Sequence, residues 1–332
     1  MSMSNKDIYL SVIIPCYNVE RFLPACIASL QRQVNADNWE FIFINDGSVD
    51  NTSLLLRGFA SLDQRVVLLE QNNQGVSSAR NNALRLIRGE YVLFLDGDDY
   101  LSDNASDVIQ SLLAQKPDGL LTSCMFVTDE KKLYNLGIVD GLYSVAGLYS
   151  CCAYFPTAPM LVYKSEIIKS HKLNFDENIH VGEVYAFTVD YFQYANNILV
   201  SHESFYNYVM HSQSATHIPN YKNDATILYT LHKLYGNIGE YTKIASFHVT
   251  AFKLVMSFTY NKYVKVKTVD KTAMAVLRNV FCDQLFLSCV RKVAFDKHSN
   301  IKDRLLALYI CFMPLKVGFK IMCILNILLE KK

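Results

Sequence analysis

The chain has no uncharged apolar run of about 20 residues, no signal-like N-terminus and no excess of charge. Residues 1–7 are polar, and the apolar stretch 305–329 is interrupted by proline, glycine and lysine, so neither a secretion signal nor a spanning helix is expected. The formal net charge is only +1 over 332 residues, which gives no support for nucleic-acid binding. We expect a globular protein.

Motifs for several cofactors are also missing. The nine cysteines are scattered, and none forms a CxxC pair or a Cys/His cluster with zinc spacing, so we expect the reduced, buried thiols of a cytosolic protein. No GxGxxG follows the first predicted strand, which disfavours a dinucleotide-dependent oxidoreductase. A nucleotidyltransferase, which shares a metal and an α/β sheet, is a weaker alternative because its glycine-rich, lysine-bearing loop is absent.

The first hundred residues alternate between strands and helices. Strands are predicted over 9–15, 39–44, 66–69 and 91–95, and helices over 19–33, 50–62 and 77–88. This alternation predicts a parallel α/β sheet covered on both faces. Ligands of such sheets bind outside the carboxyl ends of the strands, where polar clusters occur at 16–18, 45–48 and 96–99.

The last of these clusters is Asp96-Gly97-Asp98-Asp99, which directly follows the apolar run 91–95. Three carboxylates at the end of a strand repel one another. Hard cations such as Mg²⁺ and Mn²⁺ are bound by such oxygens, and substrate phosphates usually complete the shell. An acidic turn that opens a helix is the alternative, and the tetrapeptide alone leaves both interpretations open.

Four segments, 11–18, 45–52, 73–81 and 89–99, occur in the order and at the spacing of the family 2 glycosyltransferases. Residues 8–210 resemble that family, whose members have the GT-A fold and transfer sugars from nucleotide sugars with inversion. The resemblance implies a GT-A (Rossmann-like) mixed sheet flanked by helices, Mn²⁺ or Mg²⁺ as cofactor, a UDP-sugar donor and a glycan acceptor.

The resemblance assigns the loops after the first two strands to the nucleotide. Pro15, Tyr17 and Asn18 are expected to contact it, with Tyr17 stacking on the base; a packed aromatic is the alternative for Tyr17. Asp46 matches the aspartate that binds the uracil edge, because an ionised carboxylate can only accept hydrogen bonds and suits the imide N–H. A turn residue paired with Gly47 is the alternative for Asp46.

Three further residues are assigned to the nucleotide and the metal. Arg80 is expected in the first turns of the third helix, which Ser77 and Ser78 are predicted to cap. The resemblance makes Arg80 a contact to the nucleotide or to the aspartate cluster, and a surface ion pair is the alternative. It also implies that Asp96 holds the ribose and helps to position the metal, and that Asp98 binds the metal.

The catalytic base is the point where the chain departs from the family. Members usually carry a Glu-Asp pair at the start of a helix in the acceptor half, and the aspartate is generally the base. The matching positions here are Glu183 and Val184. Three explanations remain open: Glu183 is the base, Asp190 or His180 serves instead, or the protein is an inactive nucleotide-sugar-binding protein. A carboxylate near a helix N-terminus is also favoured electrostatically without a catalytic role.

Two histidines lie near the end of the predicted catalytic domain. The GT-A domain is predicted over 1–218, with a nucleotide-binding half (1–115) and an acceptor half (116–218). His211 or His217 is a candidate third metal ligand or diphosphate contact, although isolated histidines are commonly simple surface residues.

The predicted helical C-terminal region, 219–332, ends in a basic and apolar tail. Residues 297–332 carry seven Lys/Arg and two Asp/Glu, a net charge of +5, whereas the rest of the chain has a net charge of −4. This pattern predicts an amphipathic helix in the plane of an anionic membrane; packing on the body or on a homodimer partner is the alternative. We expect a cytoplasmic protein, peripheral to the inner face of the cell membrane, that extends a lipid-linked glycan.

Overall fold

The structure is a computed structural model. It describes residues 8–128, 130–134, 137–151, 160–211, 220–238, 245–259, 271–296, 299 and 301–312. The chain divides into two compact units. The first comprises Met1–Val145, Pro156–Glu177 and Phe187–Met210, and the second comprises Ala146–Phe155, Asn178–Ala186 and His211–Lys332. The division falls within helix α7 (Glu183–Phe192).

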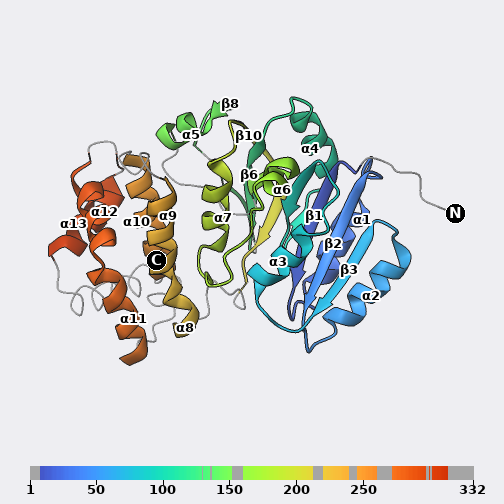
Figure 1. The fold of residues 1–332 in the computed structure, drawn as a ribbon, viewed down its shortest axis with the longest axis horizontal. Coiled ribbons are helices and arrows are strands. Elements are labelled where there is room, and N and C mark those ends of the chain that lie inside the picture. Colours follow the sequence, from blue (N-terminus) through green and yellow to red (C-terminus); the bar gives the residue numbers. More distant parts are fainter. Residues whose placement is uncertain are drawn as a thin grey trace. The chain divides into compact units, whose positions relative to one another are not determined.

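The first unit is built on a mixed sheet, which has ten strands in the described part of the chain (Figure 1). Its order is β3-β2-β1-β4-β9-β6-β10-β5, with β7 beside β6 and β8 beside β10. The strands are β1 (Leu10–Cys16), β2 (Trp39–Asp46), β3 (Val66–Gln71), β4 (Tyr91–Phe94), β5 (Tyr100–Leu101), β6 (Gly119–Val127), β7 (Lys131–Tyr134), β8 (Gly141–Ser144), β9 (Leu161–Lys164) and β10 (Asn197–Val209). This confirms the predicted mixed α/β sheet.

The pairing of the central strands brings their carboxyl ends to one edge. β1 pairs in parallel with β2 up to Cys16 opposite Asn45, and with β4 up to Ile13 opposite Phe94. Every residue of β1, β2 and β4 is buried, which is the pattern of parallel strands covered on both faces. The loops that leave β1, β2 and β4 therefore start at the same edge, as the sequence predicted.

Helices cover this sheet. The helices that lie wholly in the first unit are α1 (Leu23–Gln31), α2 (Thr52–Leu62), α3 (Val76–Leu84), α4 (Ala105–Leu113) and α6 (Ser165–Ser170). Helix α3 packs on β1 and β2, whereas α2 packs on β2 and β3 (Figure 1). The prediction that Ser77 and Ser78 cap α3 was wrong, because Gly75 is the N-cap and both serines are buried inside the helix.

The segment 133–158 contains regular structure in its described part. Strand β8 pairs antiparallel with β10, and helix α5 (Val145–Cys151) follows it directly. Strand β10 begins at Asn197 and pairs along most of β6. These strands pair with partners more than 50 residues away in sequence, and local patterns carry little information on such pairing.

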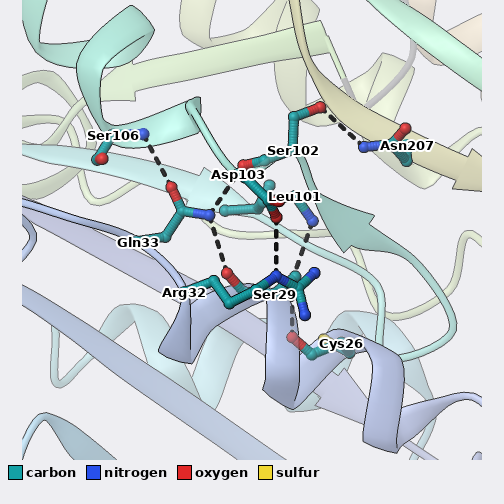
Figure 2. A network of polar contacts seen from close by, with 9 residues as sticks. All are labelled: Cys26, Ser29, Arg32, Gln33, Leu101, Ser102, Asp103, Ser106 and Asn207. Atoms are coloured by element: carbon teal, nitrogen blue, oxygen red, sulfur yellow. Dashed lines mark hydrogen bonds and ion pairs between the residues drawn. The ribbon is translucent and has the colours of Figure 1, made fainter.

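A network of polar contacts fastens the segment after the acidic tetrad (Figure 2). The buried Gln33 side chain donates through Nε2 to the carbonyls of Ser29 and Ser102, at 2.8 and 2.9 Å, and accepts from the Ser106 N–H at 3.0 Å. The Leu101 N–H donates to Ser29 Oγ at 3.1 Å. Ser29 of α1 and Gln33, just after that helix, therefore hold the chain where it leaves Asp99 and enters α4.

The second unit is helical in its described part beyond His211. Its helices are α8 (Tyr221–Asp224), α9 (Thr226–Ile238), α10 (Ala245–Thr259), α11 (Lys271–Cys282), α12 (Gln284–Phe295) and α13 (Ile301–Phe312), coloured from gold to red in Figure 1. Among the described residues, no single helix is long and apolar enough to cross a membrane. Helices α11 and α12 reach that length and apolar composition only when they are taken together, and the chain bends by 64° between them. His217 and residues 313–332 of the tail lie outside the described residues.

Cysteines in the described part of the chain are free thiols, as expected, but not all of them are buried, because Cys151 and Cys282 are exposed. Seven of them form no disulfide, namely Cys16, Cys26, Cys124, Cys151, Cys282, Cys289 and Cys311. Cys16, Cys26, Cys124 and Cys289 are buried, and burial raises the pKa of the Cys124 and Cys289 thiols to about 12. These buried thiols are therefore protonated and unreactive at neutral pH.

Candidate functional site

The loops that follow β1 and β2 are tied to each other by reciprocal hydrogen bonds. Asn18, in a left-handed backbone conformation with φ +53°, donates its N–H to Ser48 Oγ at 3.1 Å, and its side-chain oxygen accepts from the Val49 N–H at 2.9 Å. Pro15 is buried at the end of the strand, whereas Tyr17 is 49% exposed. The exposed ring of Tyr17 is not a packed aromatic, and it is accessible for stacking on a base.

Asp46 is buried and organises the loop that opens α3. Its Oδ1 accepts from the Gln74 N–H and from Gln71 Nε2, both at 2.8 Å, and its Oδ2 accepts from the Gly75 N–H at 2.9 Å. A carboxylate has about four positions that can accept hydrogen bonds, and contacts within the protein occupy three of them. The structure therefore gives Asp46 a loop-ordering role, and its predicted contact to uracil stays a prediction.

Arg80 contacts the aspartate cluster, which is one of its two predicted contacts. Its guanidinium is only 2% exposed and donates through Nη2 to Asp96 Oδ1 at 2.8 Å, whereas the Asp96 side chain is 34% exposed. The guanidinium carbon also lies 5.2 Å from the ring centre of Phe175 and 6.0 Å from that of Phe94. The interpretation of Arg80 as a surface ion pair is wrong, because the group is enclosed.

Asp99 is the buried member of the tetrad and joins it to β10. Its Oδ2 accepts from Tyr206 Oη and its Oδ1 from the Val209 N–H, both at 2.7 Å, while Tyr206 Oη accepts from the Asp96 N–H at 3.1 Å. Burial, followed by the charges of Asp98 and Asp96, holds the pKa of Asp99 well above its usual range. Burial likewise raises the pKa of Tyr206. Asp99 therefore orients the tetrad rather than capping α4.

The donor set at the end of β4 suits a divalent cation that shares its shell with phosphate. Asp96 and Asp98 are both partly exposed, whereas Asp99, which accepts hydrogen bonds from β10, is buried. Mg²⁺ and Mn²⁺ are typically held by one or two carboxylates plus substrate phosphates. Within the described residues, no group of three or more His, Cys, Asp or Glu is arranged to hold a metal. His211 as a third ligand therefore stays a prediction.

Glu183 and Val184 occupy the first turn of α7. Glu183 is the first residue of the helix and is partly exposed, whereas Val184 is buried and only 8% exposed. Asp190 lies near the other end of α7, partly exposed and in the first unit, whereas Glu183 belongs to the second. The first turn of α7 therefore leaves Glu183 in contact with solvent and buries Val184.

Comparisons with known proteins agree with this geometry. The family model described as Glycosyl transferase family 2 matches residues 11–170. An uncharacterized glycosyltransferase of Bacillus subtilis (strain 168), EpsJ, is 30% identical over 229 residues, which cover 63% of each chain. Residues 11–170 form a glycosyltransferase family 2 domain. The resemblance of the four segments to this family is thereby confirmed.

Two further glycosyltransferases extend the comparison. A poly(ribitol-phosphate) beta-glucosyltransferase of Bacillus spizizenii is 26% identical over 208 residues, covering 60% of this chain and 32% of that protein. The crystal structure of S. aureus TarS 1–349 in complex with UDP-GlcNAc has a TM-score of 0.68 at 17% identity and covers 95% of this chain and 90% of that one. This structural likeness supports the GT-A fold. The chain spans less than two thirds of these two sequence relatives.

The family motifs did not reveal several residues that support the candidate site. Tyr206 follows Asp99 by 107 positions, and Phe175 follows Arg80 by a comparable interval. Gln33, in the loop after α1, forms hydrogen bonds with the backbone of Ser102 and of Ser106, in the segment that follows the tetrad. No local sequence signal identifies such partners, because each acts through a contact that only the folded chain creates.

Proposed function

We propose that this family 2 member is a metal-dependent inverting glycosyltransferase that transfers a sugar from a UDP-sugar to a hydroxyl of a cell-surface glycan or polyol-phosphate polymer. The observation that carries the proposal is the Arg80–Asp96 pair beside Asp98, at the edge where the loops of β1 and β2 begin. A poly(ribitol-phosphate) beta-glucosyltransferase among the sequence relatives supports the acceptor class, and a UDP-GlcNAc complex among the structural neighbours supports the donor class.

The residues of the first unit would bind and orient the donor. Arg80 holds Asp96 in place and balances part of the negative charge of the tetrad. Tyr17 offers an exposed ring for the base. A bound Mn²⁺ or Mg²⁺, held by Asp96 and Asp98, would neutralise the diphosphate leaving group as a Lewis acid. Binding then orients the anomeric carbon for attack by the acceptor hydroxyl.

Glu183 is our proposed base. The acceptor hydroxyl must lose a proton as it attacks, and in this proposal the carboxylate of Glu183, the partly exposed first residue of α7, accepts it. The inactive alternative keeps one supporting observation, because the position of the usual base aspartate is filled by the buried side chain of Val184. Turnover decides between the two.

The test measures hydrolysis of UDP-GlcNAc, UDP-glucose and UDP-galactose with Mn²⁺, in which water takes the sugar in place of the acceptor hydroxyl and UDP is released, together with UDP binding by calorimetry. We expect Glu183→Gln to reduce turnover about 100-fold or more with UDP affinity unchanged. Glu166→Gln is the matched control, because Glu166 is an exposed glutamate in the first turn of another helix, α6. Full turnover by Glu183→Gln would refute the base, and UDP binding without turnover in the wild type would favour the inactive alternative.

We also propose a peripheral position on an anionic membrane. Helix α13 exposes three apolar side chains, Ile301, Leu305 and Phe312, and the basic tail 313–332 follows it. Flotation with phosphatidylglycerol vesicles should capture the full chain, and a variant lacking 313–332 should remain unbound. Equal capture of both forms, or a dimer by light scattering that needs the tail, would count against membrane binding by the tail.

A further inference from the structure

A helix of the C-terminal region holds the turn that leads into α7. Thr230, on α9, donates its hydroxyl to the Val181 carbonyl at 2.6 Å. Thr226, one helical turn earlier, accepts from the His180 N–H through Oγ1 at 3.1 Å. The two threonines therefore bind the backbone of consecutive residues just before Glu183.

The same turn is fixed by close packing at Gly182. Its φ is +78°, a left-handed conformation that favours glycine. A Cβ at this position would lie 2.9 Å from Cγ2 of Thr230 and 3.8 Å from Leu254 of α10. The Gly182 carbonyl then accepts the first hydrogen bond of α7, from the Ala186 N–H at 3.1 Å. The conformation at 180–182 thus sets where α7 begins.

We propose that Thr230 is a positioning residue for the glycosyl transfer, acting through the backbone of 181–182 to fix the direction of the Glu183 carboxylate. The proposal rests on the proposed function, in which Glu183 is the base. It extends the catalytic apparatus to α9, which lies beyond the 11–170 match to the family. The predicted donor contacts at Tyr17, Asp46 and Asp96 lie in the first unit, so Thr230 should affect turnover without affecting donor binding.

The experiment compares Thr230→Val, which keeps the shape and loses the hydroxyl, with Thr230→Ser, which keeps the hydroxyl. Turnover is measured as UDP release from UDP-GlcNAc, UDP-glucose and UDP-galactose with Mn²⁺, and donor binding as the KM and the Kd for UDP. The control is Thr259→Val, because Thr259 is a buried threonine of the same unit whose hydroxyl donates to the Val255 carbonyl at 2.8 Å. It removes a comparable hydrogen bond away from the turn.

We expect Thr230→Val to lower kcat about tenfold or more, because misplacing a reacting group by about 1 Å has effects of this size. The KM and the Kd for UDP should stay within about twofold, and Thr230→Ser should restore most of kcat. Thr259→Val should lower the thermal midpoint without lowering kcat.

Four outcomes would overturn the proposal. A wild-type kcat in Thr230→Val, or equal losses of kcat in Thr230→Val and Thr259→Val, would remove the positioning role and leave the proposed function standing. A parallel loss of UDP affinity in Thr230→Val would assign the residue to folding or donor binding. A wild type that binds UDP but releases none from any donor would overturn both the proposed function and the positioning role.

Discussion

Arg80 offers the sharpest test of how the acidic tetrad is supported. In the structure its buried guanidinium bonds Asp96 and lies over the ring of Phe175. The substitution Arg80→Met keeps an unbranched side chain of similar length and removes the charge and the donors. If Arg80 acts through Asp96, the two residues should be energetically coupled, and the substitution should destabilise the first unit.

The size of the effect follows from the contacts. A hydrogen bond to a charged group contributes about 1.5–3 kcal/mol, and the stacked cation adds about 1 kcal/mol. Water reaches Asp96, so we take the lower part of the first range, and the methionine sulfur regains about 0.5 kcal/mol against Phe175. Arg80→Met should therefore lower the free energy of unfolding by about 2 kcal/mol.

The assay follows urea unfolding by tryptophan fluorescence. Trp39 is the only tryptophan of the chain, lies on β2 and is buried, so it reports on the first unit. Measuring Arg80→Met, Asp96→Asn and the double variant completes a double-mutant cycle. We expect a coupling of about 1–2 kcal/mol between Arg80 and Asp96.

Arg57 and Glu70 provide the control cycle. They form an ion pair of the same type at the same 2.8 Å distance, but both side chains are exposed, so their coupling should lie close to zero. A coupling at Arg80–Asp96 no larger than that at Arg57–Glu70 would refute the conclusion that enclosure of Arg80 makes it a support for Asp96.

Three further predictions test neighbouring parts of the site. Gln33→Leu should destabilise the first unit by about 2–3 kcal/mol by Trp39 fluorescence, because it leaves buried backbone groups without their partner; no change would contradict the network in Figure 2. Gly47→Ala should weaken UDP binding in calorimetry, because φ is +70° and the added Cβ would lie 2.7 Å from the Asn73 nitrogen; wild-type affinity would contradict this. EDTA should weaken UDP binding about tenfold or more in the wild type and have little effect in Asp98→Asn, and an EDTA response retained in Asp98→Asn would exclude Asp98 as a metal ligand.

The sequence predicted the half of the fold that depends on local pattern. Buried parallel strands with continuous apolar runs, such as β1 and β2, were located to within two residues at each end. Their order of appearance also predicted that the loops after β1, β2 and β4 share one edge. The less regular strands β7, β8 and β9 were not predicted, because they depend on pairing with distant strands rather than on their own composition.

The candidate site divided in a similar way. Residues whose type indicates their chemistry, such as the carboxylates Asp96 and Asp98, could be identified as candidate metal-site residues from the tetrapeptide and the strand before it. The cap of α3 was assigned wrongly to the serines, because Gly75 is the N-cap and the loop before the helix donates its N–H groups to Asp46 on another strand. Thr230 carries no signal at all in the sequence, since a threonine within an apolar helical pattern is ordinary until its partner is known.

The geometry of α7 bears on why an aspartate at position 184 would not serve here. Successive helical residues point about 100° apart, and the side chain of Val184 is directed into the core while Glu183 is partly exposed. An ionised carboxylate at the buried position 184 would incur a large desolvation cost, whereas one at position 183 keeps contact with water. A base at Glu183 also has one methylene more than an aspartate, which lengthens its reach as its origin shifts by one residue. The replacement of the aspartate by valine is therefore compatible with an active enzyme, provided that the turn held by Thr230 gives Glu183 a fixed direction.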